Sequence, residues 1–138
     1  MKRIVSATAL IAAAVLSLAG LRSEELRSPF ERARSEAADR KTLVLVDFTT
    51  EWCGWCRKLE REVYPDPAVM RQLSRVVFLR LDAEHEGAPL ARRYGVAGFP
   101  MLVFVAPSGR VAGEMLGFLP ADAFAAKAKA IIDAQREP

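Results

Sequence analysis

The most constraining feature of this 138-residue chain is the segment Trp52-Cys53-Gly54-Trp55-Cys56, which directly follows the apolar run Leu43–Phe48. It holds the only two cysteines of the sequence. A buried strand that leads into a helix start places the Cys53 sulfur beside unpaired backbone N–H groups and at the positive end of the helix dipole. Both effects stabilise a thiolate, so we expect the Cys53 thiol to be unusually acidic. Cys56, one helical turn later, is positioned to attack a mixed disulfide formed at Cys53, so the pair predicts redox chemistry.

The start of the chain has the pattern of a targeting segment. A basic pair, Lys2-Arg3, precedes the uncharged and mostly apolar run Ile4–Leu18. Small residues then predict cleavage by a signal peptidase after Ala19. An uncleaved anchor stays open, because the apolar stretch approaches the ~18–20 residues that span a bilayer. We expect residues 1–19 to be a signal peptide or an anchor, and residues 20–138 to form one domain in a bacterial periplasm.

Composition and charge narrow the function classes. The 20 basic residues outnumber the 17 acidic ones by three, but two of the basic residues lie in the targeting segment. The remaining charge is nearly balanced, so we expect no nucleic-acid partner. A structural disulfide is the plain alternative in an exported protein. A disulfide across two intervening residues, however, constrains the unfolded chain little. A domain of ~120 residues can also bury enough surface to fold without a structural disulfide, so both points favour the redox role.

Helical and strand patterns alternate along the rest of the chain. The predicted strands are Leu43–Phe48, Val76–Leu81, Met101–Val105 and Val111–Leu116. A first helix is predicted to begin at the capping box Ser28-Pro29-Phe30-Glu31, and a last helix to begin at Pro120. Between them, three helices are predicted at about Cys53–Val63, Ala68–Leu73 and Ala88–Tyr94, the third ending at Gly95. The first strand is apolar almost throughout, which is typical of a central strand covered on both faces. We predict an α/β domain in which parallel strands precede a final hairpin, with helices on both faces.

Asp47 is the polar exception in the first strand. A carboxylate is costly to bury in its ionised form, so we expect its pKa to be raised. A buried acid with a raised pKa suits general acid–base catalysis. The alternative is an acid at the end of a strand that is hydrogen-bonded to the backbone.

Two segments resemble the signatures of the thioredoxin family: Asp47–Cys56 and Tyr94–Pro100. The similarity covers about Leu43–Ile132, and it is greatest to exported thioredoxin-like domains such as the carboxy-terminal domain of the thiol:disulfide interchange protein. The resemblance implies the thioredoxin fold, with a central mixed sheet of about four strands flanked by helices on both faces.

The resemblance also implies the catalytic roles. Cys53 would be the nucleophile and Cys56 the resolving cysteine. Asp47 matches the buried acid that helps to move the Cys56 proton in the family. Thioredoxins often place a lysine beside this acid, whereas the matching position here is Phe78. Arg80 lies two residues further on and could face the same side.

A substrate surface follows from the same resemblance. Pro100 would be cis, with the Phe99 backbone aligning the substrate peptide; a trans proline that enters an edge strand is the alternative. Gly117 would leave room for the substrate backbone. Both tryptophans are candidates for this surface, and we expect partial exposure beside the sulfurs for Trp55 and packing for Trp52.

A metal site has weak support in the sequence. His85 is the only histidine and lies in the acidic run Asp82–Glu86. Together with the two cysteines it matches no standard zinc spacing. Copper-carrying relatives of the fold keep a metal role open, but we read the run as a solvated loop and expect no metal ligands.

These observations predict an exported protein-disulfide oxidoreductase that reduces protein disulfides through the Cys53/Cys56 dithiol. It would need no cofactor besides this redox-active disulfide and would act as a monomer. Its partners would be protein disulfide substrates and a membrane electron donor. A disulfide oxidase or isomerase of the same fold is one alternative, and a copper or zinc carrier is another.

Overall fold

A computed structural model describes residues 27–135 of the chain. The predicted signal peptide or anchor, residues 1–19, lies outside this range. The chain divides into a unit of residues 1–32 and a compact unit of residues 33–138, and the sheet and the cysteines belong to the second. None of the helices between residues 27 and 135 is long and apolar enough to cross a membrane.

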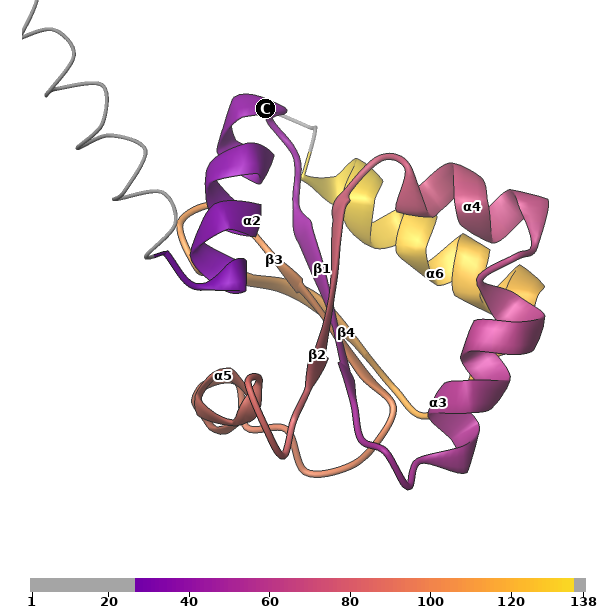
Figure 1. Cartoon of the computed structure of the whole chain (residues 1–138). Coiled ribbons are helices and arrows are strands. Elements are labelled where there is room, and N and C mark those ends of the chain that lie inside the picture. The colour runs from indigo at the N-terminus through magenta and orange to yellow at the C-terminus, as the bar shows by residue number, and fades with distance from the viewer. Residues whose placement is uncertain (1–26, 136–138) are drawn as a thin grey trace, which may run out of the picture. The chain divides into compact units, whose positions relative to one another are not determined.

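Four strands form one mixed sheet in the order β2-β1-β3-β4 (Figure 1). Strand β1 (Val44–Thr49) pairs in parallel with β2 (Val77–Asp82) and antiparallel with β3 (Met101–Val105). The hairpin partner of β3 is β4 (Val111–Leu116). The predicted parallel pair and final hairpin are therefore confirmed, and the apolar run that predicted a central strand does form β1.

Helices cover both faces of the sheet, as predicted. They are α2 (Pro29–Asp39), α3 (Gly54–Lys58), the π-helix η1 (Leu59–Val63), α4 (Pro67–Leu73), α5 (Ala88–Arg93) and α6 (Ala121–Ala134). Figure 1 shows α5 on one side of the sheet and α3, α4 and α6 on the other. The mixed four-stranded sheet between helices on both faces is the thioredoxin fold.

A cluster of buried apolar side chains lies between the sheet and the helices on the α6 side. Apolar residues of α6 keep helical spacing, and Phe124, Ala128 and Ile132 are all buried. Strand β4 approaches the same helix closely, because a Cβ added at Gly113 would lie less than 3 Å from side-chain atoms of Ile131. A larger residue at this position would therefore force the Ile131 side chain to move.

Local sequence signals fix the helix ends. The Ser28 hydroxyl accepts a hydrogen bond from the Glu31 backbone N–H (3.2 Å), so the predicted cap of α2 is confirmed. Asp66 caps α4 by accepting from the backbone N–H of Ala68 (2.8 Å). Gly95 follows α5 with φ +65°, the left-handed conformation predicted for it.

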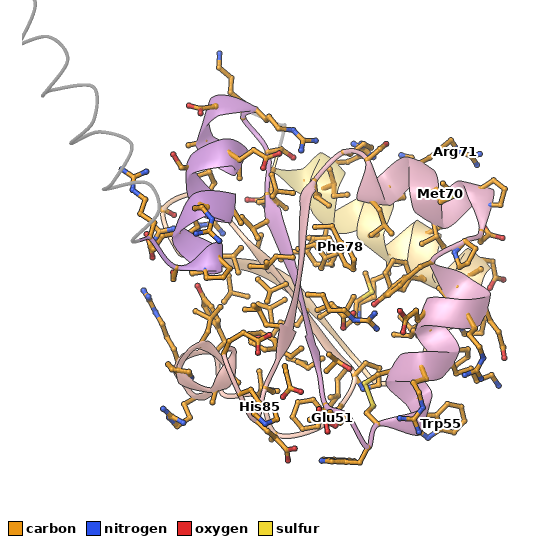
Figure 2. All side chains as sticks on the ribbon, viewed as in Figure 1. Glu51, Trp55, Met70, Arg71, Phe78 and His85 are labelled. Atoms are coloured by element: carbon orange, nitrogen blue, oxygen red, sulfur yellow. A yellow bond between two sulfur atoms is a disulfide. The ribbon has the colours of Figure 1, made fainter. Side chains whose placement is uncertain are left out.

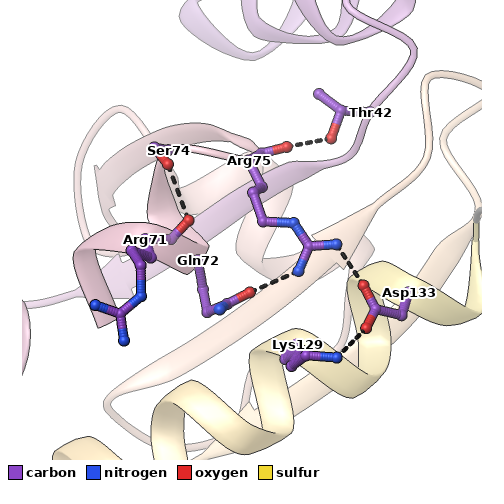
Figure 3. A network of polar contacts seen from close by, with 7 residues as sticks. All are labelled: Thr42, Arg71, Gln72, Ser74, Arg75, Lys129 and Asp133. Carbon is purple, nitrogen blue, oxygen red and sulfur yellow. Dashed lines mark hydrogen bonds and ion pairs between the residues drawn. The ribbon is translucent and has the colours of Figure 1, made fainter. Parts of the chain in front are cut away.

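A polar network links α4 with α6 at the end of β1 that is remote from Cys53 (Figure 3). Arg75 donates hydrogen bonds to Gln72 of α4 and to Asp133 of α6. Asp133 also accepts from Lys129 (2.6 Å). Hydrogen bonds from Lys129 and Arg75 lower the pKa of Asp133 to about 2. The network therefore adds charge-assisted hydrogen bonds between the two helices.

Candidate active site

The two cysteines form a disulfide at the start of α3, with their Cα atoms 5.3 Å apart. Cys53 is the N-cap residue and has an extended backbone. Its sulfur accepts a hydrogen bond from the Cys56 backbone N–H (3.1 Å). This is the position at a helix start that the sequence predicted. It supplies one N–H group and the positive end of the helical stretch Gly54–Val63 to the Cys53 sulfur.

Trp52 lies on the surface, so the prediction that it packs in the interior is wrong. Its side chain is 64% exposed. The indole N–H donates to the Glu84 carboxylate (3.1 Å), and the ring meets Phe99 edge-on with centroids 5.8 Å apart. The residue precedes the helix in a turn, where the ring can reach the loop after β2 instead of the core.

Trp55 is also exposed, as expected for a residue beside the sulfurs. Its ring lies 5.5 Å from that of Phe118. The ammonium group of Lys58 lies over both rings, 5.3 Å from the Trp55 centroid and 4.9 Å from the Phe118 centroid. Phe118 was missed by the sequence reasoning, although its place directly after Gly117 could have indicated it.

The segment before β3 completes this surface. The Phe99–Pro100 bond is cis, so the alternative of a trans proline is wrong. The Gly117 backbone N–H donates to the Pro100 carbonyl (2.8 Å). Gly117 itself has φ +83°, and an added Cβ would meet no atom within 4 Å. Its backbone conformation, and not crowding, accounts for the glycine.

Contacts therefore connect all five residues predicted for the substrate surface. One set runs from Trp52 to Phe99 and another joins Gly117 to Pro100, while Trp55 contacts the residue after Gly117. Their role in binding a substrate stays a prediction.

Asp47 is almost fully buried, with 1% of its surface exposed. Its Oδ2 atom accepts a hydrogen bond from the Tyr64 hydroxyl (2.7 Å). Burial raises the pKa of Asp47; the Tyr64 hydrogen bond and the Arg80 charge oppose this rise, and the Glu60 charge adds to it. The alternative for Asp47 was a hydrogen bond with the backbone. The hydrogen bond to Oδ2 comes instead from the Tyr64 side chain.

The cation beside Asp47 is Arg80. The two residues are partners in the β1–β2 register, and the Arg80 Nε atom lies 3.3 Å from Asp47 Oδ2. Arg80 also reaches Glu60 of η1, with 2.9 Å between Nη1 and Oε1. Phe78 is paired with Leu45 instead, so it is not the residue beside the acid.

Tyr64 is a second residue of this site that sequence reasoning missed. It lies eight residues after Cys56 and four after Glu60, so the helical stretch brings these side chains toward the same face. A buried carboxylate needs a hydrogen-bond donor, and this spacing could have identified the tyrosine.

The acidic loop is solvated, as predicted. His85 is exposed, and a hydrogen bond with Asp82, together with the Asp82 charge, raises the pKa of the imidazole. Figure 2 shows His85 and Glu51 at the end of the sheet that also carries Trp55. Between residues 27 and 135 no cluster of three or more histidine, cysteine, aspartate and glutamate side chains could hold a metal ion.

Comparisons with known proteins agree with this geometry. Residues 30–132 match the family described as thioredoxin-like domain. The chain is 31% identical over 108 residues to the thiol:disulfide interchange protein DsbD of Pseudoalteromonas atlantica, a match that covers 75% of this chain and 18% of that protein. It is 42% identical over 80 residues to the protein disulfide isomerase-like 2-1 of Oryza sativa subsp. japonica, covering 58% of this chain and 21% of that protein. The chain thus spans about a fifth of the length of these curated relatives.

Solved structures give the same picture. A thioredoxin from Thermus thermophilus matches with a TM-score of 0.67 and 32% identity, over 75% of this chain and 84% of that one. The reduced C-terminal domain of DsbD from Neisseria meningitidis matches with a TM-score of 0.64 over 73% of this chain and 92% of that one. At 24% identity, this second match supports the fold alone.

Proposed function

The chain belongs to the thioredoxin-like family of thiol-disulfide oxidoreductases, as its two signature segments predicted, and on that premise we propose that it is an exported protein that reduces the disulfides of other proteins. The observation that carries the proposal is the Cys53–Cys56 disulfide at a helix start. A pair that is joined in this structure can also exist as a dithiol, and the dithiol is the form that donates electrons.

The reaction starts from the reduced pair. The Cys53 thiolate attacks one sulfur of a substrate disulfide; a new S–S bond forms, and the other substrate sulfur leaves as a thiolate. Cys56, after losing its proton, attacks the Cys53 sulfur and expels the second substrate thiolate. The substrate gains two electrons and takes up two protons, one released by Cys56 and one from solvent, while the protein is left with the Cys53–Cys56 disulfide.

Asp47 is proposed to accept the proton of Cys56. Burial raises the pKa of Asp47, so this pKa is closer to that of a thiol than the pKa of an exposed carboxyl would be. The exposed aromatic residues Trp52 and Trp55, with Phe99, would hold the substrate polypeptide over the sulfurs. Backbone groups near Pro100 and Gly117 would align it.

The direction of electron flow and the location are also part of the proposal. A buried acid in β1, the strand that leads to the pair, supports reduction, because a proton acceptor for Cys56 would assist release of the substrate. The basic and apolar start of the chain supports export. Outside the cytoplasm the pair would be reduced again by a dithiol of a membrane electron donor. The match to relatives named thiol:disulfide interchange protein supports this proposal.

The redox state of the two cysteines in living cells tests the direction. Cells would be quenched with acid, and free thiols would be labelled with an alkylating reagent that adds mass. We expect most of the protein to carry two labels, with Cys53→Ser as the control that can carry one. A protein recovered mostly without label would contradict a reductase and support an oxidase.

A further inference from the structure

The two oxygens of the Asp47 carboxyl group have different surroundings. Oδ2 accepts the Tyr64 hydrogen bond and lies near the Arg80 guanidinium. Oδ1 is buried and has no hydrogen-bond partner among residues 27–135. A buried oxygen without a partner is costly when it carries negative charge, but a protonated oxygen carries none. Oδ1 is therefore the oxygen on which a proton relieves the larger penalty.

In the oxidised protein, where Cys53 and Cys56 do not titrate, the charged and titratable groups that shift the pKa of Asp47 come from two stretches of the chain. Glu60 and Tyr64 belong to η1 and the residue after it, and Arg80 comes from β2. The neighbour on β3 is Leu102, which is apolar and buried. Arg80 also binds Glu60, so its charge is shared between two carboxylates. The Tyr64 hydroxyl is consequently the donor that serves Asp47 alone.

The Tyr64 ring is held on two sides. It meets Phe78 edge-on with centroids 5.4 Å apart and Phe124 edge-on at 5.9 Å. Burial, together with the Asp47 charge and hydrogen bond, raises the pKa of Tyr64, so the hydroxyl keeps its proton at neutral pH. A ring fixed by packing and a hydroxyl that stays protonated give Asp47 a donor of constant position.

We propose that Tyr64 is a positioning residue for the proton step: its hydroxyl holds Oδ2 of Asp47 and leaves Oδ1 as the oxygen that takes the proton of Cys56. The inference rests on the proposed function, in which Asp47 accepts that proton. The S–H bond of Cys56 breaks, an O–H bond forms at Oδ1, and the electron pair stays on the Cys56 sulfur for its attack on Cys53. The proton later leaves Oδ1 for a substrate thiolate or solvent.

Tyr64→Phe removes the hydroxyl and keeps the ring that packs against Phe78 and Phe124. A hydrogen bond donated to the ionised carboxylate stabilises that form, so its loss should raise the pH at which Asp47 releases its proton. Replacing Tyr64 with 3-fluorotyrosine should act in the opposite direction, because a more acidic phenol is a stronger donor.

The direct measurement is a ¹³C NMR titration of the Asp47 side-chain carboxyl in the oxidised protein. We expect the Asp47 midpoint to move to higher pH in Tyr64→Phe and to lower pH with 3-fluorotyrosine at position 64. Tyr94→Phe is the matched control, since it also removes a hydroxyl from a partly buried ring, and it should leave the midpoint unchanged. An Asp47 midpoint that is the same in all four proteins would overturn the inference. This titration uses no substrate, so it can fail or succeed independently of the proposed function.

A kinetic measurement then connects the contact with the reaction. Reduction of a protein disulfide should rise with pH as Asp47 ionises, and Tyr64→Phe should move this rise upward by the shift seen in the titration. In an Asp47→Asn background, the same substitution should cause no further shift. A Tyr64→Phe profile with the parental midpoint, despite a shifted Asp47 titration, would separate the tyrosine from the proton step and contradict the proposal.

Discussion

At the scale of single residues, the site depends on a carboxyl group that the fold keeps out of water. Asp47 lies in the central strand β1 with 1% of its surface exposed. Tyr64 and Arg80 offset part of the cost of ionising it, but burial remains the larger effect on its pKa. Ionised Asp47 therefore destabilises the folded protein. Such a cost is typical of a residue that has a role in catalysis.

Asp47→Asn should stabilise the protein, and by more at neutral than at acidic pH. The folded pKa of Asp47 lies above the ordinary value of 3.8. Below that value the carboxyl is protonated in both the folded and the unfolded state, so its ionisation does not affect the free energy of unfolding. As the pH rises from there toward the folded pKa, the unfolded state ionises first, and the parent loses stability that the variant keeps.

Urea unfolding at several pH values from 3.5 to 8 measures this difference. Asp39→Asn, which changes an exposed acid in the same way, serves as the control for the substitution itself. A stability gap for Asp47→Asn that stays constant across the range would show that the carboxyl is not destabilised by burial.

The sequence predicted the candidate catalytic residues of the site better than the residues that contact them. The cysteines and Asp47 stand out because their types and spacing are unusual in an apolar context. Tyr64 does not, because its contact with Asp47 depends on where the helical stretch packs on the sheet. Trp52 was expected to pack, whereas its indole N–H donates to Glu84 at the surface.

At the scale of elements, the stretch after the cysteines holds the least expected feature. The sequence predicted one helix over Cys53–Val63, and the structure has α3 followed by the π-helix η1. The Tyr64 backbone N–H donates to the Leu59 carbonyl five residues earlier (3.0 Å). Leu59 and Val63 are buried four residues apart, which suits either kind of helix, so the apolar pattern could not distinguish them. Tyr64 reaches Asp47 directly after this wider turn.

The next helix begins at a cap that can be tested by itself. Asp66 accepts hydrogen bonds from the backbone N–H groups of Ala68 (2.8 Å) and Val69 (3.3 Å). Asp66→Ala should lower the free energy of unfolding by about 1 kcal/mol, whereas Asp66→Ser should retain most of it. Denaturant unfolding checks both variants. Equal losses for alanine and serine would mean that the side-chain cap contributes nothing.

At the scale of the whole molecule, we expect the core and the sheet topology to hold the fold together without help from the disulfide. The topology was predictable because an apolar central strand, a helix-length connection and a hairpin turn each leave a strong pattern. The disulfide joins residues only three positions apart. By the loop-closure relation, a loop of this size stabilises the fold by no more than about 2 kcal/mol.

Reduction of the disulfide should therefore leave the fold intact. We expect the reduced protein to keep its far-ultraviolet circular dichroism spectrum and to unfold in one cooperative transition. Its free energy of unfolding should differ from that of the oxidised form by about 2 kcal/mol or less. Parallel urea titrations with and without reductant measure this difference. A reduced chain without cooperative unfolding would make the disulfide a structural staple.

The identity of the attacking sulfur is the central claim, and intact mass spectrometry tests it most directly. Reduced Cys56→Ser and Cys53→Ser proteins would each be mixed with a protein that carries one disulfide. Because Cys53 lies at the helix start, Cys56→Ser should accumulate a covalent adduct whose mass is the sum of the two proteins, and a reductant should release it. Cys53→Ser should form little adduct. An adduct that appears only with Cys53→Ser, or with neither variant, would contradict the mechanism.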